Sequence, residues 1–177
     1  VCRLKDMLAE EKPVIFPFEK IAFLRTVPTI PEIFTEEEFA IISAKNYIHE
    51  QGKVCNISPE YSLILTTGLE EKRAQISSAY DHFKKAGDSE KAEYEKALLD
   101  TIDTILSFCD RYRQEAEKQG NHTVADTLSR IPRQKPQTLL EALQFMRIIH
   151  YCLWCSFNYH NTLGRFDQYM YPFYKHD

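Results

Sequence analysis

Residues 88–120 read DSEKAEYEKALLDTIDTILSFCDRYRQEAEKQG and form the longest helical pattern of the sequence. Its apolar side chains recur every three or four residues, which is the rhythm of a helix with one buried stripe. At about 1.5 Å per residue, some thirty residues make a rod of about 45 Å, which requires a large body to pack against. The stripe consists of Tyr94, Leu98, Ile102, Ile105, Cys109, Tyr112 and Ala116.

Helical signals continue on both sides of the rod. Capping boxes, in which a threonine is followed three residues later by a glutamate, occur at Thr35 with Glu38 and at Thr138 with Glu141. No segment shows the sustained alternation of a half-buried strand, so the sequence predicts an all-α chain. The further helices are expected at 35–52, 58–68, 69–85, 123–130 and 138–159.

The first 34 residues form a different kind of segment. A short amphipathic start is followed by four prolines, Pro13, Pro17, Pro28 and Pro31, which prevent a continuous helix. We therefore expect an N-terminal arm over 1–34, extended across a helical unit over 35–177. The side chains expected to hold the arm down are Ile15, Phe16, Phe18, Ile21, Phe23 and Leu24.

Composition excludes several classes of protein. The 177 residues are 44% hydrophobic and 27% charged, and the net charge of −4 offers no basic surface for nucleic acid. The longest apolar run, 139–157, contains Glu141, Arg147 and His150, which would be costly inside a membrane. No secretory signal pattern is visible, so we expect a cytoplasmic protein. Five scattered cysteines indicate reduced thiols.

Two groups of residues have side chains that can form redox or metal sites. Cys152 and Cys155 have the C-x-x-C spacing but lie within an apolar helix, where they are expected to be small core residues. His150, Tyr159 and His160 lack a nearby carboxylate or cysteine at ligand spacing, so no metal site is predicted.

The last fourteen residues, 164–177, place five aromatic side chains around Arg165 and Asp167. A charged pair in such surroundings is expected to be partly buried and hydrogen-bonded. The pair can either fix the following segment in place or contact a substrate, and the structural role is favoured.

The same residues resemble the pyruvate formate-lyase-like family of glycyl radical enzymes. The resemblance rests on Ile131-Pro132, Pro136 and Thr138 to Gln144, and then on Gly164-Arg165-Phe166-Asp167-Gln168 and the aromatic run to Tyr174. Weaker support comes from Ile57-Ser58-Pro59-Glu60-Tyr61. The residues expected to act as a structural motif are Glu141, Gln144, Gly164, Arg165, Asp167 and Gln168.

The resemblance implies that this chain is the N-terminal helical part of a larger enzyme built on a ten-stranded α/β barrel. The cysteine that forms a thiyl radical and the glycine that stores the radical would lie outside it, so no catalytic residue is expected here. The parent would form a homodimer, bind no separate organic cofactor and receive its radical from an activase that uses S-adenosylmethionine and an iron–sulfur cluster. It would cleave a C–C or C–heteroatom bond of a small molecule.

One departure from the family pattern concerns a substrate contact. In the diol-dehydratase-like branch, the segment before the residue that matches Pro59 usually reads Gly-His. This chain has Cys55-Asn56 at those positions. Asn56 is retained as a substrate-binding candidate that can hydrogen-bond but cannot act as an acid or base. Two alternatives to the enzyme fragment are a free-standing helical interaction module and an unrelated all-α domain.

Overall fold

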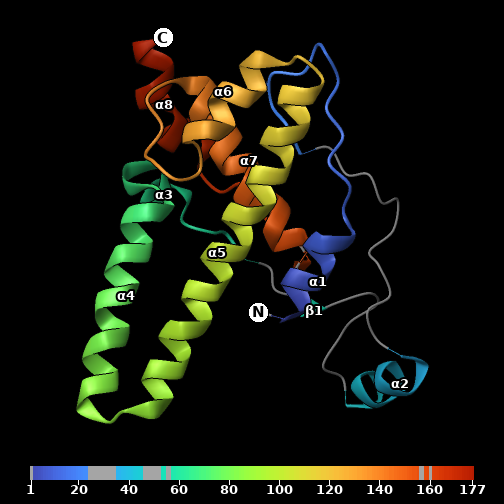
Figure 1. Ribbon diagram of the computed structural model, residues 1–177, viewed down its shortest axis with the longest axis vertical. Helices are drawn as coiled ribbons and strands as arrows, with labels where there is room; N and C mark the ends of the chain where they lie inside the picture. Colours follow the sequence, from blue (N-terminus) through green and yellow to red (C-terminus); the bar gives the residue numbers. More distant parts are fainter. Residues whose placement is uncertain (1, 24–34, 46–52, 55–56, 156–157, 160) are drawn as a thin grey trace.

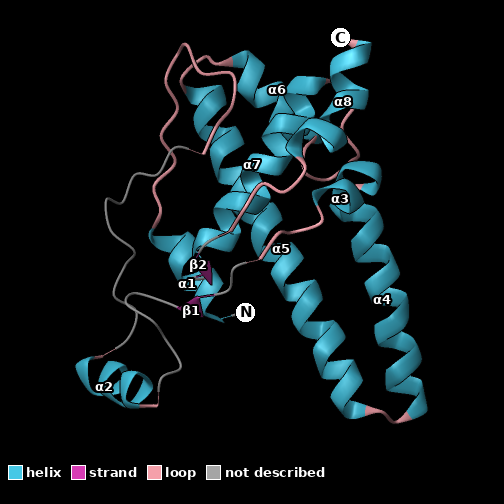
Figure 2. Cartoon of the chain, turned by 180° about the vertical axis from the view of Figure 1, so that it is seen from behind, coloured by secondary structure: helices cyan, strands magenta, loops and turns pink. Residues whose placement is uncertain are grey.

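The computed structural model describes residues 2–23, 35–45, 53–54, 57–155, 158–159 and 161–177. This part of the chain is helical apart from two strands of two residues each, so the all-α prediction is confirmed with one small addition (Figures 1 and 2). The elements are α1 (Cys2–Glu10), α2 (Glu36–Ala44), β1 (Lys53–Val54), α3 (Tyr61–Thr67), α4 (Leu69–Ala86), α5 (Ser89–Lys118), α6 (His122–Arg130), α7 (Leu139–Cys155), β2 (Asn158–Tyr159) and α8 (Phe166–His176).

Helices α4 and α5 form a long antiparallel hairpin (Figure 1). The turn is made by Gly87, which has a left-handed backbone, and by Asp88, whose carboxylate accepts from the backbone N–H of Lys91 at 3.2 Å. Nearer the body of the molecule, Arg73 of α4 donates two hydrogen bonds, of 2.7 and 3.1 Å, to Asp103 of α5. The predicted thirty-residue rod is therefore confirmed, together with its start.

The buried stripe of α5 differs from the predicted one near its start, where Ala92 and Leu99 are the buried residues. Tyr94 is 64% exposed, so its place in the stripe is wrong, and Leu98 is only half-buried. Figure 1 shows α4 running beside the first part of α5, and α5 also contacts α1 and α6. The buried residues of α5 are Ala92, Leu99, Ile102, Ile105, Leu106, Phe108, Cys109, Tyr112 and Ala116.

The junction between α3 and α4 is tied to the loop that follows α6. The first two N–H groups of α4, those of Leu69 and Glu70, donate to the carbonyls of Pro132 and Arg133, both at 2.9 Å. Gly68 lies against that loop, and a Cβ placed on it would come within 2.5 Å of the carbonyl carbon of Gln134. The helix N-terminus thus finds backbone acceptors that a side chain at residue 68 would displace.

The N-terminal arm is held through its backbone. The two terminal nitrogens of Arg111 donate to the carbonyls of Leu8 and Glu11 at 2.8 and 2.7 Å. Asn121 reaches two further arm carbonyls, those of Phe16 and Glu19, at 3.0 and 2.9 Å.

The arm then turns inward at Phe23. The backbone N–H of Ala22 donates to the buried side chain of Gln144 at 2.7 Å, and Arg147 donates to the carbonyl of Phe23 at 2.6 Å. The Phe23 ring is fully buried and stacks on Tyr112 with ring centroids 4.2 Å apart. Its φ of 81° is strained for a non-glycine residue, so packing and hydrogen bonds must hold it there.

The sequence identified the arm's anchors only in part. Ile15 and Phe23 are buried as expected, but Phe16 and Phe18 are 39% and 81% exposed, so these two predictions are wrong. The two exposed rings stack on each other instead of entering the core. Leu24 lies outside the described residues.

Helix α7 is the apolar core helix that the sequence predicted, although it ends at Cys155 and the chain then enters β2. Thr138 accepts from the backbone N–H of Glu141, as in a capping box, but the carboxylate of Glu141 accepts from Gln137 and from Arg130. Asp177, which ends α8, accepts from the N–H of Leu139 at 2.8 Å. The two helices are therefore joined where α7 begins.

Helix α2 carries the other capping box, which is complete, with both Thr35 and Glu38 accepting from each other's backbone. It ends at Ala44, and none of its residues is buried. Residues 46–52 of the predicted helix lie outside the described part of the chain.

Candidate functional site

Two segments far apart in sequence lie side by side next to α3 and α8. Strand β1 pairs in parallel with β2, Lys53 opposite Asn158 and Val54 opposite Tyr159. The contact continues past the strands, where the N–H of Thr162 donates to the carbonyl of Ile57 at 3.0 Å. These are the segments that contain or precede two of the three motifs quoted above.

The motifs meet closely at Ser58 and Gly164. Gly164 has a φ of 60°, and a Cβ on it would lie 2.5 Å from the hydroxyl oxygen of Ser58. The left-handed backbone favours glycine at residue 164, and a Cβ there would also force the Ser58 hydroxyl to rotate away. The first residue of this motif therefore lies where the two segments cross.

A cleft of about 430 Å³ opens between the two motifs. Its walls are the chain from Ser58 to Ser62 on one side and Arg165, Gln168 and Tyr169 on the other. The hydroxyl of Ser62 donates to Glu60 at 2.7 Å, and that of Tyr169 donates to the carbonyl of Leu163 at 2.7 Å. The cleft is open, its lining mixes polar and apolar surface, and Glu60 and Arg165 are its charged residues.

Arg165 and Asp167 do not behave as the sequence indicated. Both are exposed, and within the described residues neither side chain takes part in an ion pair, so the expected partial burial is wrong. Two of the five aromatic side chains that suggested burial are themselves largely exposed, Tyr171 at 59% and Tyr174 at 69%, while Tyr169 and Phe173 are partly buried against the core. Of this helix, Met170 is the residue that enters the core.

Beneath the cleft, Tyr61, His150 and Trp154 form a hydrogen-bonded row. The hydroxyl of Tyr61 lies 2.9 Å from Nδ1 of His150, and the indole N–H of Trp154 donates to Nε2 at 3.0 Å. Burial, and then the charge of Arg147, lower the pKa of His150. Burial, with a smaller contribution from Tyr169, raises the pKa of Tyr61 to about 12. At neutral pH both groups are therefore uncharged.

The hydrogen-bonded row bears on the prediction that His150 does not bind a metal. Both ring nitrogens are engaged by other side chains, so no lone pair is left for an ion. Across the part of the chain with assigned positions, no cluster of three metal-binding side chains occurs. His160 and Asn56 lie outside the described residues.

The C-x-x-C pair is part of the core, as predicted. Cys152 and Cys155 are buried within α7, and Cys109 of α5 is buried too. Burial raises the pKa of the thiols of Cys109 and Cys152 well above the usual range. These thiols are therefore poor nucleophiles.

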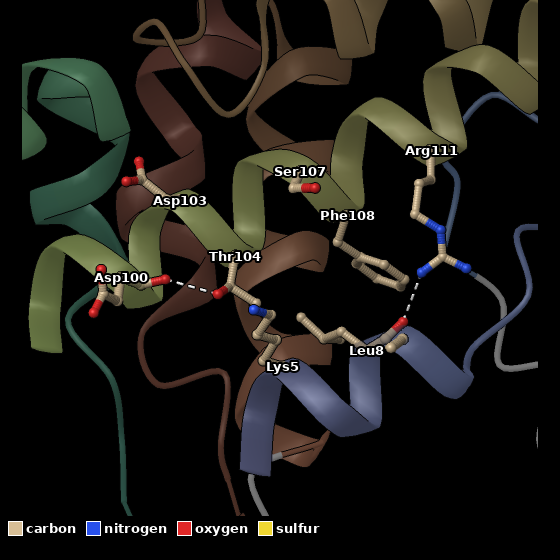
Figure 3. Close-up of a pocket in the computed structure, with 9 residues that line it drawn as sticks. Lys5, Leu8, Asp100, Asp103, Thr104, Ser107, Phe108 and Arg111 are labelled. Carbon is tan, nitrogen blue, oxygen red and sulfur yellow. Dashed lines mark hydrogen bonds between the residues drawn. The ribbon is translucent and has the colours of Figure 1, made fainter. Parts of the chain in front are cut away.

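A larger groove of about 630 Å³ runs between α1 and α5. Figure 3 shows two of its polar groups with partners: the hydroxyl of Thr104 bonds to the carbonyl of Asp100, and Arg111 bonds to that of Leu8. The carboxylates of Asp100 and Asp103 are paired with Lys96 and Arg73. Lys5 and Ser107 complete the polar part of the lining.

The sequence did not point to the side chains that hydrogen-bond to the backbone of the N-terminal arm, or to the one that hydrogen-bonds to Tyr61. Arg111, Asn121 and Arg147 looked like ordinary polar residues of helices, because their partners are backbone carbonyls about a hundred residues away. For the row on α7, the four-residue spacing of His150 and Trp154 was an available signal.

The fold built from these elements is that of the helical portion of glycyl radical enzymes. A glycyl radical enzyme from Archaeoglobus fulgidus superposes with a TM-score of 0.80 at 19% identity, covering 98% of this chain and 31% of that one. A structure from a study of 1,2-propanediol dehydration in Roseburia inulinivorans gives a TM-score of 0.77 at 19% identity, covering 98% and 29%. The B12-independent glycerol dehydratase of Clostridium butyricum gives 0.75 at 17% identity, covering 98% and 31%.

Sequence comparison gives the family. The pattern described as pyruvate formate lyase-like matches residues 30–177, and the chain belongs to that family. A curated relative, the probable dehydratase YbiW of Escherichia coli K12, is 23% identical over 163 residues, which are 82% of this chain and 20% of the relative. The chain thus spans about a fifth of that relative and less than a third of the three solved structures.

None of the helices with assigned positions is both long and apolar enough to cross a membrane.

Proposed function

We propose that this chain is the N-terminal helical portion of a glycyl radical enzyme that cleaves a C–C or C–heteroatom bond of a small molecule. The radical glycine and the thiyl cysteine belong to polypeptide outside residues 1–177, and these residues alone are inactive. The relatives named for a reaction are named for dehydration, which favours cleavage of a C–O bond.

The observation that carries the proposal is the crossing of the two motif segments. Ser58 and Gly164 are 106 positions apart, and yet a Cβ on residue 164 would lie 2.5 Å from the hydroxyl oxygen of Ser58. The family match over residues 30–177 includes both segments, so the crossing joins two parts of the family pattern in space.

In the full-length enzyme, this chain has a supporting and positioning role and does not carry out the chemistry. Cys109, Cys152 and Cys155 are buried, burial raises the pKa of Cys109 and Cys152, and His150 is neutral with both nitrogens engaged, so none of these groups is suited to start chemistry. Asn56 remains our candidate for a substrate hydrogen bond, because it follows β1 and precedes the Ser58 crossing. Glu141, Gln144, Gly164, Arg165, Asp167 and Gln168 act as structural residues.

The radical would be installed by a separate activase that uses S-adenosylmethionine and an iron–sulfur cluster. It would then pass from glycine to cysteine and to the substrate. The parent is proposed to be a cytoplasmic homodimer of anaerobic metabolism with no further organic cofactor.

Electron paramagnetic resonance tests this proposal. The polypeptide encoded by the whole reading frame is activated without oxygen by a radical activase and S-adenosylmethionine, and frozen. A glycyl radical keeps one hydrogen on Cα, so a doublet is expected that collapses when the protein is labelled with Cα-deuterated glycine. The 177-residue chain, treated in the same way, is the control and should give no signal. Absence of the doublet from fully activated samples of the longer polypeptide would refute the proposal.

A further inference from the structure

Helix α2 is short and rich in apolar side chains, and the described part of the chain does not bury any of them. None of its nine residues is buried, and Phe39 and Ile41 are 44% and 57% exposed. Figures 1 and 2 both show α2 standing apart from the other helices. Helices shorter than about twelve residues are marginal in water unless one face packs against another surface. The length and composition of α2 therefore indicate a surface that covers it.

One side of α2 carries charged and apolar side chains in a fixed order. Residues three, four and seven positions apart lie on the same side of a helix. An acid begins such a set, two isoleucines follow in its middle, and a base ends it at the C-cap. We refer to these four side chains as the α2 face: Glu38, Ile41, Ile42 and Lys45.

The groups of the α2 face are open to contact. Glu38 and Ile41 are exposed, and Ile42 is partly exposed. The carboxylate of Glu38 accepts from the backbone N–H of Thr35 through Oε2 at 2.9 Å, which leaves Oε1 for a second donor. The face thus combines an apolar centre with charges of opposite sign at its two ends.

This order makes the α2 face complementary to a second copy of itself. When two α2 helices pack antiparallel about a two-fold axis, residue 38 of one lies opposite residue 45 of the other, and residue 41 lies opposite residue 42. Each Glu38 then meets a Lys45, the isoleucines cover one another, and the antiparallel helix dipoles attract. A parallel pair would place acid beside acid and base beside base.

We propose that the α2 face binds the α2 face of a second copy of this chain in antiparallel orientation. The inference rests on one part of the proposed function, the homodimer, and it names the surface through which the two copies meet. Two helices of nine residues bury much less than the about 1,600 Å² of a standard interface, so the contact is weak in the 177-residue chain, with a Kd of about 100 µM.

Cross-linking locates the contact. In the antiparallel pair residue 41 lies beside the two-fold axis, and therefore close to residue 41 of the second copy. A short bis-maleimide should join Ile41→Cys to itself, whereas Ala40→Cys, exposed on the other side of α2, should give no more covalent dimer than the unchanged chain. The unchanged chain measures the background from its own cysteines. Equal yields from the two variants would overturn the proposal.

Sedimentation over a range of concentrations measures the strength of the contact. Ile41→Asp places a charge in the apolar centre, and Lys45→Glu places acid opposite acid, so each should raise the Kd at least about tenfold. The effect of Lys45→Glu should shrink at high salt, because exposed charges are screened.

Two controls match these variants in charge. Ala40→Asp lies on the other side of α2, and Lys135→Glu lies at an exposed position of the loop after α6. Both should leave the Kd unchanged, and circular dichroism shows whether all four variants are folded. A chain that stays monomeric at every concentration, or equal effects of the variants on and off the α2 face, would contradict the inference.

The polypeptide encoded by the whole reading frame tests the alternative occupant. If the rest of that polypeptide covered the α2 face, Ile41→Cys would not cross-link there and Ile41→Asp would lower the Tm without dissociating a dimer, and this result would refute the proposal. Cross-linking at residue 41 without a glycyl radical signal would remove the radical enzyme and keep the contact. A radical signal from a protein whose dimer is indifferent to Ile41→Asp would do the reverse.

Discussion

The indole N–H of Trp154 donates to Nε2 of His150 at 3.0 Å, and this one bond fixes the state of the imidazole. Indole is a donor only, so Nε2 must accept and carry no hydrogen. The hydrogen of the neutral ring is therefore on Nδ1, where it faces the Tyr61 hydroxyl 2.9 Å away. Protonation would add a hydrogen to Nε2 and replace an attraction to the indole N–H by a clash.

We predict that His150 makes the chain more stable as pH rises through its lowered folded-state pKa toward about 6.5. The pKa of His150 is lowered in the folded state, so between that pKa and the unfolded value of about 6.5 the unfolded chain binds more protons. The contribution is complete above about pH 6.5 and is lost as pH falls through the folded pKa.

Urea unfolding at a series of pH values measures this effect. His150→Gln keeps an acceptor for Trp154 and a donor for Tyr61 but does not titrate, so the slope of stability against pH should fall. His122→Gln, at an exposed position, should leave the slope as it is. The same slope in His150→Gln and the unchanged chain would show that His150 is not the titrating group.

Gly68→Ala is predicted to be severely destabilising. The residue combines a φ of 84° with a ψ of 166°, a region open essentially to glycine, and a new methyl would overlap the backbone of residues 133–135. Because those backbone atoms cannot move without breaking the hydrogen bonds that begin α4, we expect a loss of more than about 3 kcal/mol.

Gly87→Ala is the matched control. Its φ of 75° is also left-handed, but nothing lies within 4 Å of the new Cβ, so a loss of about 1 kcal/mol is expected. Denaturant unfolding compares the two. Similar losses would mean that the approach of the 133–135 loop does not constrain residue 68.

These cases show what the sequence could and could not supply. The starts of α2 and α5 follow from caps made by Thr35, Glu38 and Asp88 with residues three positions away, and such local signals are readable. Whether Tyr94 is buried or exposed depends on which helices lie beside that part of α5, and a helical period in the sequence does not carry that information. The side chain is exposed.

The candidate site was predictable only as a set of motifs. That Ser58 meets Gly164, and that β1 pairs with β2, depends on contacts across about a hundred residues, and two-residue strands leave no alternating pattern. The exposure of Arg165 was missed because aromatic neighbours in sequence do not guarantee aromatic neighbours in space.

Phe23→Ala is predicted to loosen the arm. The ring is fully buried between Phe108, Tyr112 and Tyr151, so its removal should cost about 3 to 5 kcal/mol, reduced by any relief of the strained φ. Phe18→Ala, at a ring that is 81% exposed, should change stability by less than about 0.5 kcal/mol. Unfolding curves and limited proteolysis within residues 11–23 measure the difference, and equal cleavage of the two variants would contradict the anchoring role of Phe23.

The buried thiols are predicted to resist alkylation in the native chain. Cys109, Cys152 and Cys155 are buried, and burial raises the pKa of Cys109 and Cys152, so both access and thiolate are lacking. With iodoacetamide at pH 8, mass spectrometry should find these three modified at least about a hundred times more slowly than in concentrated urea. Ser129→Cys adds a thiol at an exposed position of α6 and should react rapidly in the same native sample. Modification of Cys152 as fast as that added thiol would show that α7 is open to solvent at the C-x-x-C pair and would contradict its place in the core.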